Sequence, residues 1–457
     1  MTTITAVVKE DCPTCQLVEP VLQELLANGV VDVIHREDEP AGLETSYRLG
    51  IETVPTLIKG DERLVGWDQA KWEAFTGVPG LGAGLPDYRP GCGSKTLDPG
   101  VAEELAVRFH GGELRSRRVE LGELEDEAEA MFDRGWTDGL PVVPPTEARV
   151  LRMLTGTTRS PDEVVTIVPP DLVECTVEKV AVNAVMAGCR PEYLPVVLAC
   201  VEAACTDEFN MHGLLATTYF SGPVVIVNGP IARAIGMNSR GNALGQGNRA
   251  NATIGRALQL VVRNVGGGKP GGVDRATLGN PGKYTFCFAE DEQDSPWEPL
   301  SVERGFDPSA STVTLFAGEG SRGIIDQLSR TPEALAASLA AGLRSVAHPK
   351  LAMGFDAFLV VSPEHARVFA EAGWSKAQVK EALHSHLQMD GADIIRGAGG
   401  IAEGVPEGFA GATLPKFGPQ GLWLVHAGGK AGLFSAIIGG WVNGATGSQP
   451  VTREVGT

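Results

Sequence analysis

The sequence predicts an α/β protein with a small N-terminal domain at residues 1–78 and a large C-terminal domain at residues 135–457. In both parts, strand-like apolar runs alternate with segments of helical periodicity. A stretch rich in glycine and proline separates the two parts. We expect this stretch, residues 79–134, to form a linker, an arm that carries Cys92, and an acidic helix from about Leu121 to Phe132.

The small domain is predicted to contain its elements in the order β-α-β-α-β-β-α. Short apolar runs mark the strands, and apolar residues three and four apart mark the helices. Turn signals such as Asn28-Gly29 and Gly60-Asp61 separate them. The expected strands are Ile4 to Val8, Val31 to His35, Thr56 to Lys59 and Leu64 to Val65, and the expected helices start at Cys12, Leu43 and Asp68.

The large domain is predicted to repeat a strand, a loop of small or polar residues, and a helix. Ligands of such βα units collect beyond the carboxyl ends of the strands, so the loops that follow the strands are candidate sites. A further helix is expected from Asn251 to Val262, and a strand from Lys283 to Cys287. The expected strand and helix pairs are 224–227 with 231–235, 358–361 with 366–372, and 422–425 with 433–438.

The chain of 457 residues carries 57 acidic and 38 basic side chains, a formal net charge of −19. A surface of this sign repels nucleic-acid phosphates and anionic lipid headgroups. No apolar run supplies the about 20 clean residues that cross a bilayer, and the N-terminal segment lacks the basic stretch of a signal peptide. We expect a cytoplasmic protein that binds neither nucleic acid nor membrane, and homo-oligomers are compatible with this composition.

Cys12-Pro13-Thr14-Cys15 follows a predicted strand and opens a predicted helix. In this position both sulfurs meet in the first helical turn, and the backbone N–H groups with the helix dipole stabilise a thiolate at Cys12. We expect Cys12 to attack and Cys15 to resolve. The alternatives are half of a zinc site or two inert core cysteines. Zinc needs four ligands, and this domain offers only His35 besides the pair, so no metal or other cofactor is expected.

Thr53-Val54-Pro55-Thr56 places a proline directly before a predicted strand. Such a proline is often cis, which exposes the backbone of the preceding residue to an extended thiol partner, although an edge-strand proline is the alternative. Together with the element order and the cysteine pair, Val54-Pro55 makes residues 1–78 resemble a minimal thioredoxin/glutaredoxin-like domain. The resemblance implies that Cys12 is the nucleophile, Cys15 the resolving thiol and Pro55 the cis-proline.

Cys92 lies between glycines, in a segment too glycine-rich to bury it in a core. Open access suits a nucleophile or a redox centre, and an inconsequential loop cysteine is the alternative. The tetrad Cys92-Gly93-Ser94-Lys95 resembles the signature of a bacterial family named for its Sec-Gly-Ser-Cys (UGSC) motif. That resemblance implies that Cys92 is the reactive atom. Lys95 stands where that family has its second cysteine, a role that Cys12 and Cys15 could fill.

The densest polar segment of the large domain, residues 236–251, interleaves Asn, Arg and Gly without carboxylates. Arginine forks, amide donors and glycines that admit close approach make an anion cradle. The alternative is a structured surface loop that caps the following helix. The candidate substrate-binding residues in this segment are Asn238, Arg240, Asn248, Arg249 and Asn251.

Several single residues complete the candidate sites. His365, His426 and Lys430 follow predicted strands and are candidates for acid–base work or carboxylate binding. His212 is a further candidate, with a hydrogen-bonded structural histidine as the alternative. The remaining cysteines lie in apolar segments and are expected in the core: Cys175, Cys189, Cys200, Cys205 and Cys287.

These observations predict a thiol–disulfide oxidoreductase. The large domain would bind a small anionic or electrophilic substrate, Cys92 would react with it, and the thioredoxin-like domain would restore Cys92 at the expense of an external thiol reductant. The chain beyond the small domain resembles uncharacterised bacterial thioredoxin fusions, which implies a dedicated client reaction. Two alternatives stay open: a non-enzymatic partner-binding protein with a redox-maintenance domain, and a hydrolase or lyase with a regulatory thioredoxin-like domain.

Overall fold

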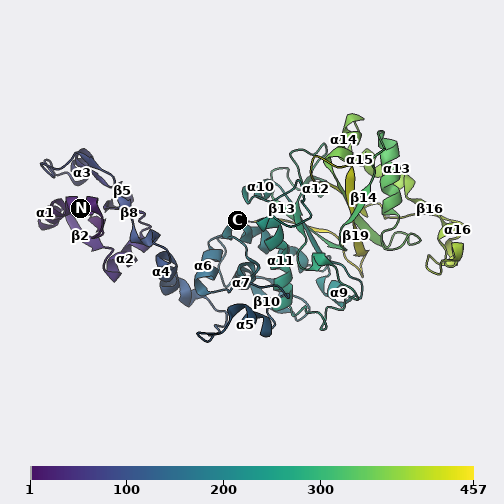
Figure 1. Cartoon of the computed structure of the whole chain (residues 1–457), viewed down its shortest axis with the longest axis horizontal. Coiled ribbons are helices and arrows are strands. Elements are labelled where there is room, and N and C mark those ends of the chain that lie inside the picture. The colour runs from purple at the N-terminus through teal and green to yellow at the C-terminus, as the bar shows by residue number, and fades with distance from the viewer. Residues whose placement is uncertain (1–2, 457) are drawn as a thin grey trace. The chain divides into compact units, whose positions relative to one another are not determined.

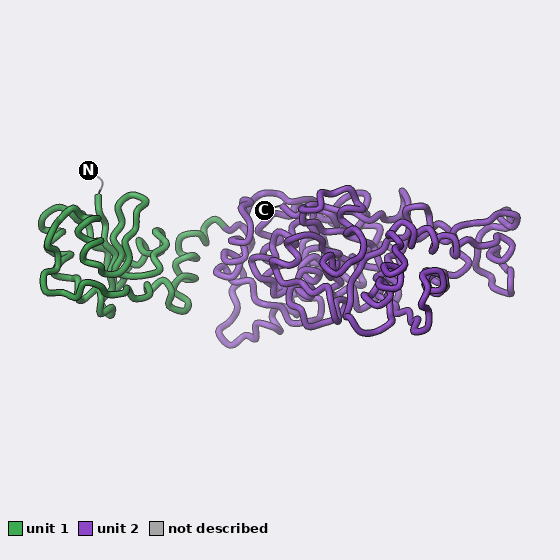
Figure 2. Tube along the Cα trace, turned by 90° about the horizontal axis from the view of Figure 1, so that it is seen from above, with its two compact units in different colours: residues 1–113 green, residues 114–457 purple. Residues whose placement is uncertain are grey.

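The computed structural model describes residues 3–456 and divides into two compact units, the first ending at Glu113 and the second beginning at Leu114 (Figure 2). Helices and strands are mixed in both units, so the expected mixed α/β class is confirmed. The expected linker at residues 79–134 is not a separate segment, because its first part belongs to unit 1 and its remainder to unit 2. Among residues 3–456, no helix is long and apolar enough to cross a membrane.

Unit 1 contains a four-stranded sheet in the order β2-β1-β4-β5, where β1 and β2 are parallel and the other neighbours are antiparallel. Apolar residues of the sheet and of α1 form its core. The helices and strands of unit 1 are β1 (Ile4–Val8), α1 (Pro13–Ala27), β2 (Val31–Arg36), α2 (Pro40–Arg48), β3 (Thr53–Val54), β4 (Thr56–Lys59), β5 (Glu62–Val65), β6 (Trp67–Asp68), α3 (Gln69–Thr76), β7 (Tyr88–Arg89), β8 (Cys92–Gly93) and α4 (Val101–His110).

The glycine-rich segment after α3 packs onto unit 1. Leu81 is buried in the core, and the Trp67 indole donates a hydrogen bond to Pro86 O at 2.6 Å. Two short antiparallel ladders fix the segment further, β6 with β7 and β3 with β8. A composition rich in glycine suggests a flexible linker. In the structure, apolar and backbone contacts hold this segment in one place, and the glycines serve to turn the chain sharply.

Unit 2 contains an eight-stranded sheet that bends where β13 meets β19, because these two strands share only the Gly318–Gly440 pair. The helices and strands of unit 2 are α5 (Glu127–Asp133), α6 (Glu147–Leu154), β9 (Val164–Val168), β10 (Val173–Thr176), α7 (Val177–Ala187), α8 (Leu194–Ala204), α9 (Met211–Ala216), β11 (Gly222–Asn228), α10 (Pro230–Ala234), α11 (Arg249–Asn264), β12 (Cys287–Ala289), α12 (Leu300–Glu303), β13 (Thr312–Gly318), β14 (Arg322–Ile325), α13 (Pro332–Leu343), β15 (Phe355–Val361), α14 (Pro363–Glu371), α15 (Lys376–His386), β16 (Gln388–Asp390), α16 (Gly391–Ile394), β17 (Thr413–Pro415), β18 (Leu422–His426), β19 (Phe434–Val442) and β20 (Val451–Glu454).

The two halves of the bent sheet pack face to face and carry helices on their outer faces. Alternate residues of each strand point to opposite faces, so Val224 and Phe358 meet in the inner core while Val225 and Leu359 face the helices. Helices α8 and α11 cover one outer face, with α7 packed on α11, and α13, α14 and α15 cover the other (Figure 1). Unit 2 is thus built in four layers, helix on sheet on sheet on helix.

Three sequence-based expectations for these elements are wrong. The predicted helix at 433–438 is part of strand β19, which pairs with β14 and β15. A Cβ on Gly440 would lie 2.7 Å from the Phe316 ring, so packing against Phe316 requires glycine at this position of the strand. The acidic helix is only α5, and the strand expected at 283–287 begins at Cys287, because Lys283 and Tyr284 belong to a turn.

We expect a fragment of residues 1–113 to unfold cooperatively and a fragment of residues 1–78 to be less stable. Loss of the buried Leu81 side chain alone removes about 1.5–3 kcal/mol of hydrophobic stabilisation. Urea unfolding followed by circular dichroism measures the difference in the free energy of unfolding. Equal stabilities would show that residues 79–113 do not belong to this folding unit.

Candidate functional site

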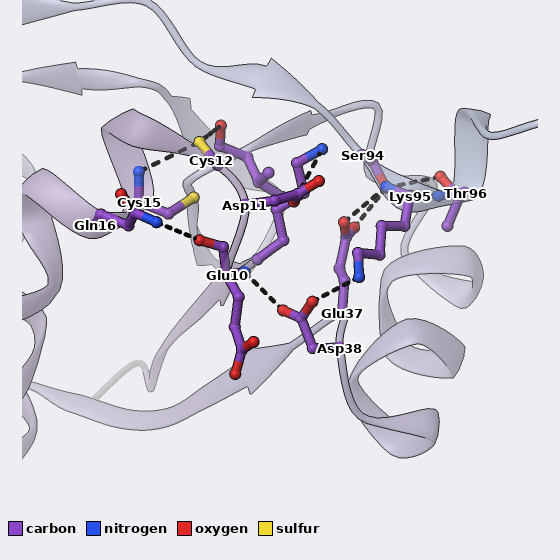
Figure 3. Close-up of polar contacts among 12 residues, drawn as sticks. Glu10, Asp11, Cys12, Cys15, Gln16, Glu37, Asp38, Ser94, Lys95 and Thr96 are labelled. Carbon is purple, nitrogen blue, oxygen red and sulfur yellow. Dashed lines mark hydrogen bonds and ion pairs between the residues drawn. The ribbon is translucent and has the colours of Figure 1, made fainter.

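Cys12 lies at the end of the loop that joins β1 to α1, where it is the N-cap of the helix. Its Sγ accepts a hydrogen bond from the backbone N–H of Cys15 at 3.2 Å (Figure 3). In the thiol form it donates to Val54 O at 3.6 Å. Pro13 occupies the first helical position, where a missing N–H costs nothing. The local sequence therefore forms the expected helix start with both sulfurs in its first turn.

Cys92 is brought to the same place by a short antiparallel ladder. Strands β3 and β8 pair Val54 with Cys92, and the Val54–Pro55 peptide bond is cis, as expected. The Thr14 hydroxyl donates to Pro90 O at 2.6 Å, which ties the segment to the start of α1. The Cys92 thiol lies close enough to Cys12 to lower the pKa of Cys12. Unit 1 thus gathers three free thiols in one site.

A buried carboxylate holds the residues that follow Cys92. Glu37 accepts hydrogen bonds from the hydroxyls of Ser46 and Ser94 and from the backbone N–H of Lys95, the last at 2.8 Å (Figure 3). The Lys95 ammonium reaches the neighbouring Asp38 at 2.5 Å. Ser94 and Lys95 of the Cys-Gly-Ser-Lys tetrad therefore anchor the segment that carries Cys92.

The electrostatics separate the roles of the three thiols. Burial alone would raise the pKa of Cys12, but hydrogen bonds from Cys92, Cys15 and the Thr14 N–H outweigh it and lower the pKa below the ordinary value. Burial raises the pKa of Cys15, and so does the charge of Cys12. Burial raises the pKa of Cys92 as well, and its hydrogen bond to Cys12 adds to this. Of the three thiols, Cys12 is therefore the one whose surroundings favour the thiolate form.

Access to these thiols differs. Cys12 is 0% and Cys15 1% exposed, whereas Cys92 is partly exposed. A molecule in solution therefore meets Cys92 first. The arrangement can carry out thiol–disulfide exchange, in which a thiolate attacks one sulfur of a disulfide and the other leaves. In the described part of the chain, no group of three or more His, Cys, Asp or Glu side chains is arranged to hold a metal ion.

The remaining cysteines lie in unit 2. Four of them are buried as expected, and Cys205 is partly exposed. Burial raises the pKa of Cys189 and of Cys205 to about 12, so both stay protonated near neutral pH.

The asparagine side chains of the Asn/Arg segment build the loop itself. Asn248 caps helix α11 through the N–H of Asn251. Asn251 is buried and bonds to both the N–H and the C=O of Asn238. The Asn238 side chain in turn accepts from the Arg240 N–H and donates to Gly241 O. The contacts of these three asparagines are those of a structured loop that caps the helix, which was the alternative to an anion cradle.

Arg240 does not lie in a cradle free of carboxylates. Its guanidinium forms ion pairs with Asp291 at 3.2 Å and Asp294 at 3.3 Å, from the segment after β12. Lys430 pairs with the same Asp294 at 3.0 Å. These carboxylates are distant in sequence, and they already pair with the charges of Arg240 and Lys430.

The strand-end loops do gather, as expected for α/β sheets. The Asp291 N–H donates to His426 O, and the Gly428 N–H donates to Ser239 O, so the ends of β12 and β18 meet residues 236–251. His365 and His426 are buried: His365 bonds to Ser435 Oγ and Asp326 O, and the His426 Nδ1 to Asp291 O. His212 is exposed on the first turn of α9.

Arg249 lies in a different setting from Arg240. With Arg149, Arg152 and Arg190 it lines a cavity of about 630 Å³, in which Glu192 is the acidic lining residue. All four arginines are exposed, and within residues 3–456 none of them forms an ion pair with a carboxylate. We call this the four-arginine cavity. The sequence predicts unpaired positive charge for binding an anion at residues 236–251. In the structure, the arginines of the four-arginine cavity provide such charge.

A second cavity of about 520 Å³ was not predicted from the sequence. Its wall includes the glycine-rich segment from Gly268 to Tyr284, together with residues of α9, α11 and the start of β11. The sequence carries the glycine runs Gly266-Gly267-Gly268 and Pro270-Gly271-Gly272 here, and such runs by themselves predict turns rather than a cavity. The polar residues of the cavity come from four separate segments, and no local pattern joins them.

Comparison of the chain with family models, with curated proteins and with solved structures gives no match. Functional inference therefore starts from the side chains of this chain.

We expect the pKa of Cys12 to lie below that of an ordinary cysteine and to rise in Cys92→Ala, which removes a group that lowers it. Cys92→Ser keeps an O–H donor and should retain most of the lowering. The ultraviolet absorbance of the thiolate against pH measures both variants. An unchanged Cys12 titration in Cys92→Ala would contradict the hydrogen bond between them.

Inorganic pyrophosphate should bind the four-arginine cavity. Arg249→Gln should weaken this binding about tenfold or more, because a charge-assisted hydrogen bond is worth about 1.5–3 kcal/mol. Arg240→Gln is the matched control and should leave the affinity unchanged, because Arg240 is paired with Asp291 and Asp294. Calorimetric titration measures both. A larger loss in Arg240→Gln than in Arg249→Gln would favour the original cradle.

Proposed function

We propose that the chain is a thiol–disulfide oxidoreductase whose unit 1 recycles Cys92 of the same chain. The observation that carries the proposal is the position of Cys92, whose backbone pairs with that of Val54 and whose thiol lowers the pKa of Cys12. An extended thiol partner of a thioredoxin-like domain is expected to dock on the residue before the cis-proline, and here Cys92 takes that place. The β2-β1-β4-β5 sheet with α1 opening at Cys12 also supports the thioredoxin/glutaredoxin resemblance.

In the first step a small disulfide R–S–S–R′ reacts with Cys92, the exposed thiol. Cys92 loses its proton and attacks one sulfur of the substrate. A disulfide bond forms between Cys92 and R–S, and R′–S⁻ leaves and takes up the proton as R′–SH. The Cys12 thiolate then attacks the Cys92 sulfur. The Cys12–Cys92 bond forms and R–S⁻ leaves. The substrate has gained two electrons, and the chain has lost two.

In the second stage Cys15 resolves the Cys12–Cys92 disulfide. Its sulfur attacks Cys12, the bond to Cys92 breaks, and the proton of Cys15 ends on the departing Cys92. An external dithiol then reduces the Cys12–Cys15 disulfide and is itself oxidised to a disulfide. The lowered pKa of Cys12 supports its role in both exchange steps, because the thiolate is the nucleophile in thiol–disulfide exchange.

Unit 2 would bind the substrate. The four-arginine cavity supports an anionic substrate, since multiple guanidinium groups bind anions with charge-assisted hydrogen bonds. The hydrolase or lyase alternative finds less support, because His365 has both ring nitrogens engaged and His426 is buried.

The relay predicts that Cys15→Ser traps a Cys12–Cys92 disulfide. With the anionic disulfide dithionitrobenzoate as oxidant, digestion and mass spectrometry should yield the Cys12–Cys92 cross-linked peptide. Cys205→Ser, which replaces a partly exposed cysteine of unit 2, is the matched control and should not accumulate it.

Cys92→Ser should lose rapid exchange with dithionitrobenzoate, because Cys12 and Cys15 are buried. Its Cys12–Cys15 pair should still cycle with a dithiol reductant. Wild-type exchange kinetics in Cys92→Ser, together with an unmodified Cys92 in Cys15→Ser, would refute the relay and leave Cys12 and Cys15 as the redox centre.

A further inference from the structure

Three residues that line the 520 Å³ cavity of unit 2 each carry a buried polar atom that has no hydrogen-bond partner within residues 3–456. Ser221 Oγ, Gln259 Nε2 and Arg263 Nε are all buried without a hydrogen-bond partner, and all three residues line this cavity. Ser221 is only 1% exposed. Native proteins pair nearly all buried polar groups, so three unpaired ones around one cavity indicate a ligand.

The three groups are well placed to act together. Gln259 and Arg263 are one turn apart on α11 and therefore share a face of the helix. Ser221 directly precedes β11, and a Cβ built on the adjacent Gly222 would lie 3.8 Å from Gln259 Nε2. The amide nitrogen and the guanidinium can only donate, and the hydroxyl can donate. The missing partner is therefore an acceptor.

The charge around the cavity specifies that acceptor. Asp138 is neutralised by Arg256 through two hydrogen bonds of 2.8 Å, and Asp274 by Lys283 at 2.8 Å. Arg263 has no ion-pair partner among the described residues. One positive charge is left uncompensated, which matches a ligand that carries one negative charge.

One side of the wall is apolar. Met211, Leu214 and Leu215 of α9 and Val262 of α11 line the cavity, and each is almost fully buried in the fold. The cavity volume lies in the range of small-molecule sites, about 300–1,000 Å³. A site with converging donors on one side and apolar side chains on another suits a ligand with one polar end and an apolar body.

We propose that this cavity binds an organic monocarboxylate, with its carboxylate on Arg263, Gln259 and Ser221 and its apolar body against α9. A planar carboxylate takes parallel hydrogen bonds from a guanidinium, and its second lone pairs are available to the amide and the hydroxyl. The site goes beyond the proposed thiol relay and does not depend on it, because none of its residues is a cysteine.

Calorimetric titration of the full chain with octanoate, octanol and inorganic phosphate tests the proposal. Octanoate should bind saturably, and octanol and phosphate should bind at least about tenfold more weakly, since each lacks one half of the recognised chemistry. Arg263→Gln should weaken octanoate binding about tenfold to a hundredfold. Arg367→Gln, an exposed arginine of α14, is the matched control and should bind as the wild type does.

Ser221→Ala separates a ligand contact from a structural role. Because the hydroxyl has no partner in the protein, this variant should keep or raise the Tm while it weakens octanoate binding. It also keeps the proposal testable if Arg263→Gln does not fold. No saturable octanoate binding, equal affinity of Ser221→Ala and wild type, or tighter binding of phosphate than of octanoate would each overturn the monocarboxylate site. Thiol exchange that stays intact in these variants would leave the relay unaffected.

Discussion

The position of Cys92 depends on one buried carboxylate. Glu37 is 2% exposed and accepts hydrogen bonds from two hydroxyls and a backbone N–H. A carboxylate is expensive to bury unless it is hydrogen-bonded, so Ser94 and Lys95 must stay on unit 1 as long as Glu37 stays inside it. Cys92 lies two residues before Ser94 and is therefore held over Cys12. A packing requirement of the core thus fixes the geometry of a chemical site.

The local elements of the fold were predictable from the sequence, and their long-range pairing was not. Apolar runs located β1, β11, β15 and β18, because a strand buried on both faces is visible as a continuous hydrophobic segment. For strand β19 the sequence predicts a helix, because apolar residues three and four apart also suit a helix and the pairing of β19 with β14 and β15 is not encoded nearby.

The same distinction holds for the sites. The Cys-x-x-Cys pair and its helix start are contiguous in sequence, so their chemistry was visible before the structure. The neutralisation of Arg240 was not, because Asp291 and Asp294 come from a distant segment. Ser221, Gln259 and Arg263 likewise meet only through the packing of β11 on α11. The residue type predicts which interactions a side chain can make, whereas tertiary contacts determine whether its charge is already paired.

Because Cys92 belongs to the same chain as Cys12, the exchange between them in the proposed relay is a unimolecular reaction. Its rate would not depend on the concentration of the protein, whereas reduction of the Cys12–Cys15 disulfide by a separate dithiol would. At low reductant the chain would therefore accumulate with Cys12 and Cys15 oxidised and Cys92 reduced. Each molecule could complete one turnover in a cell depleted of reductant, and the supply of dithiol would set the pace of every later one.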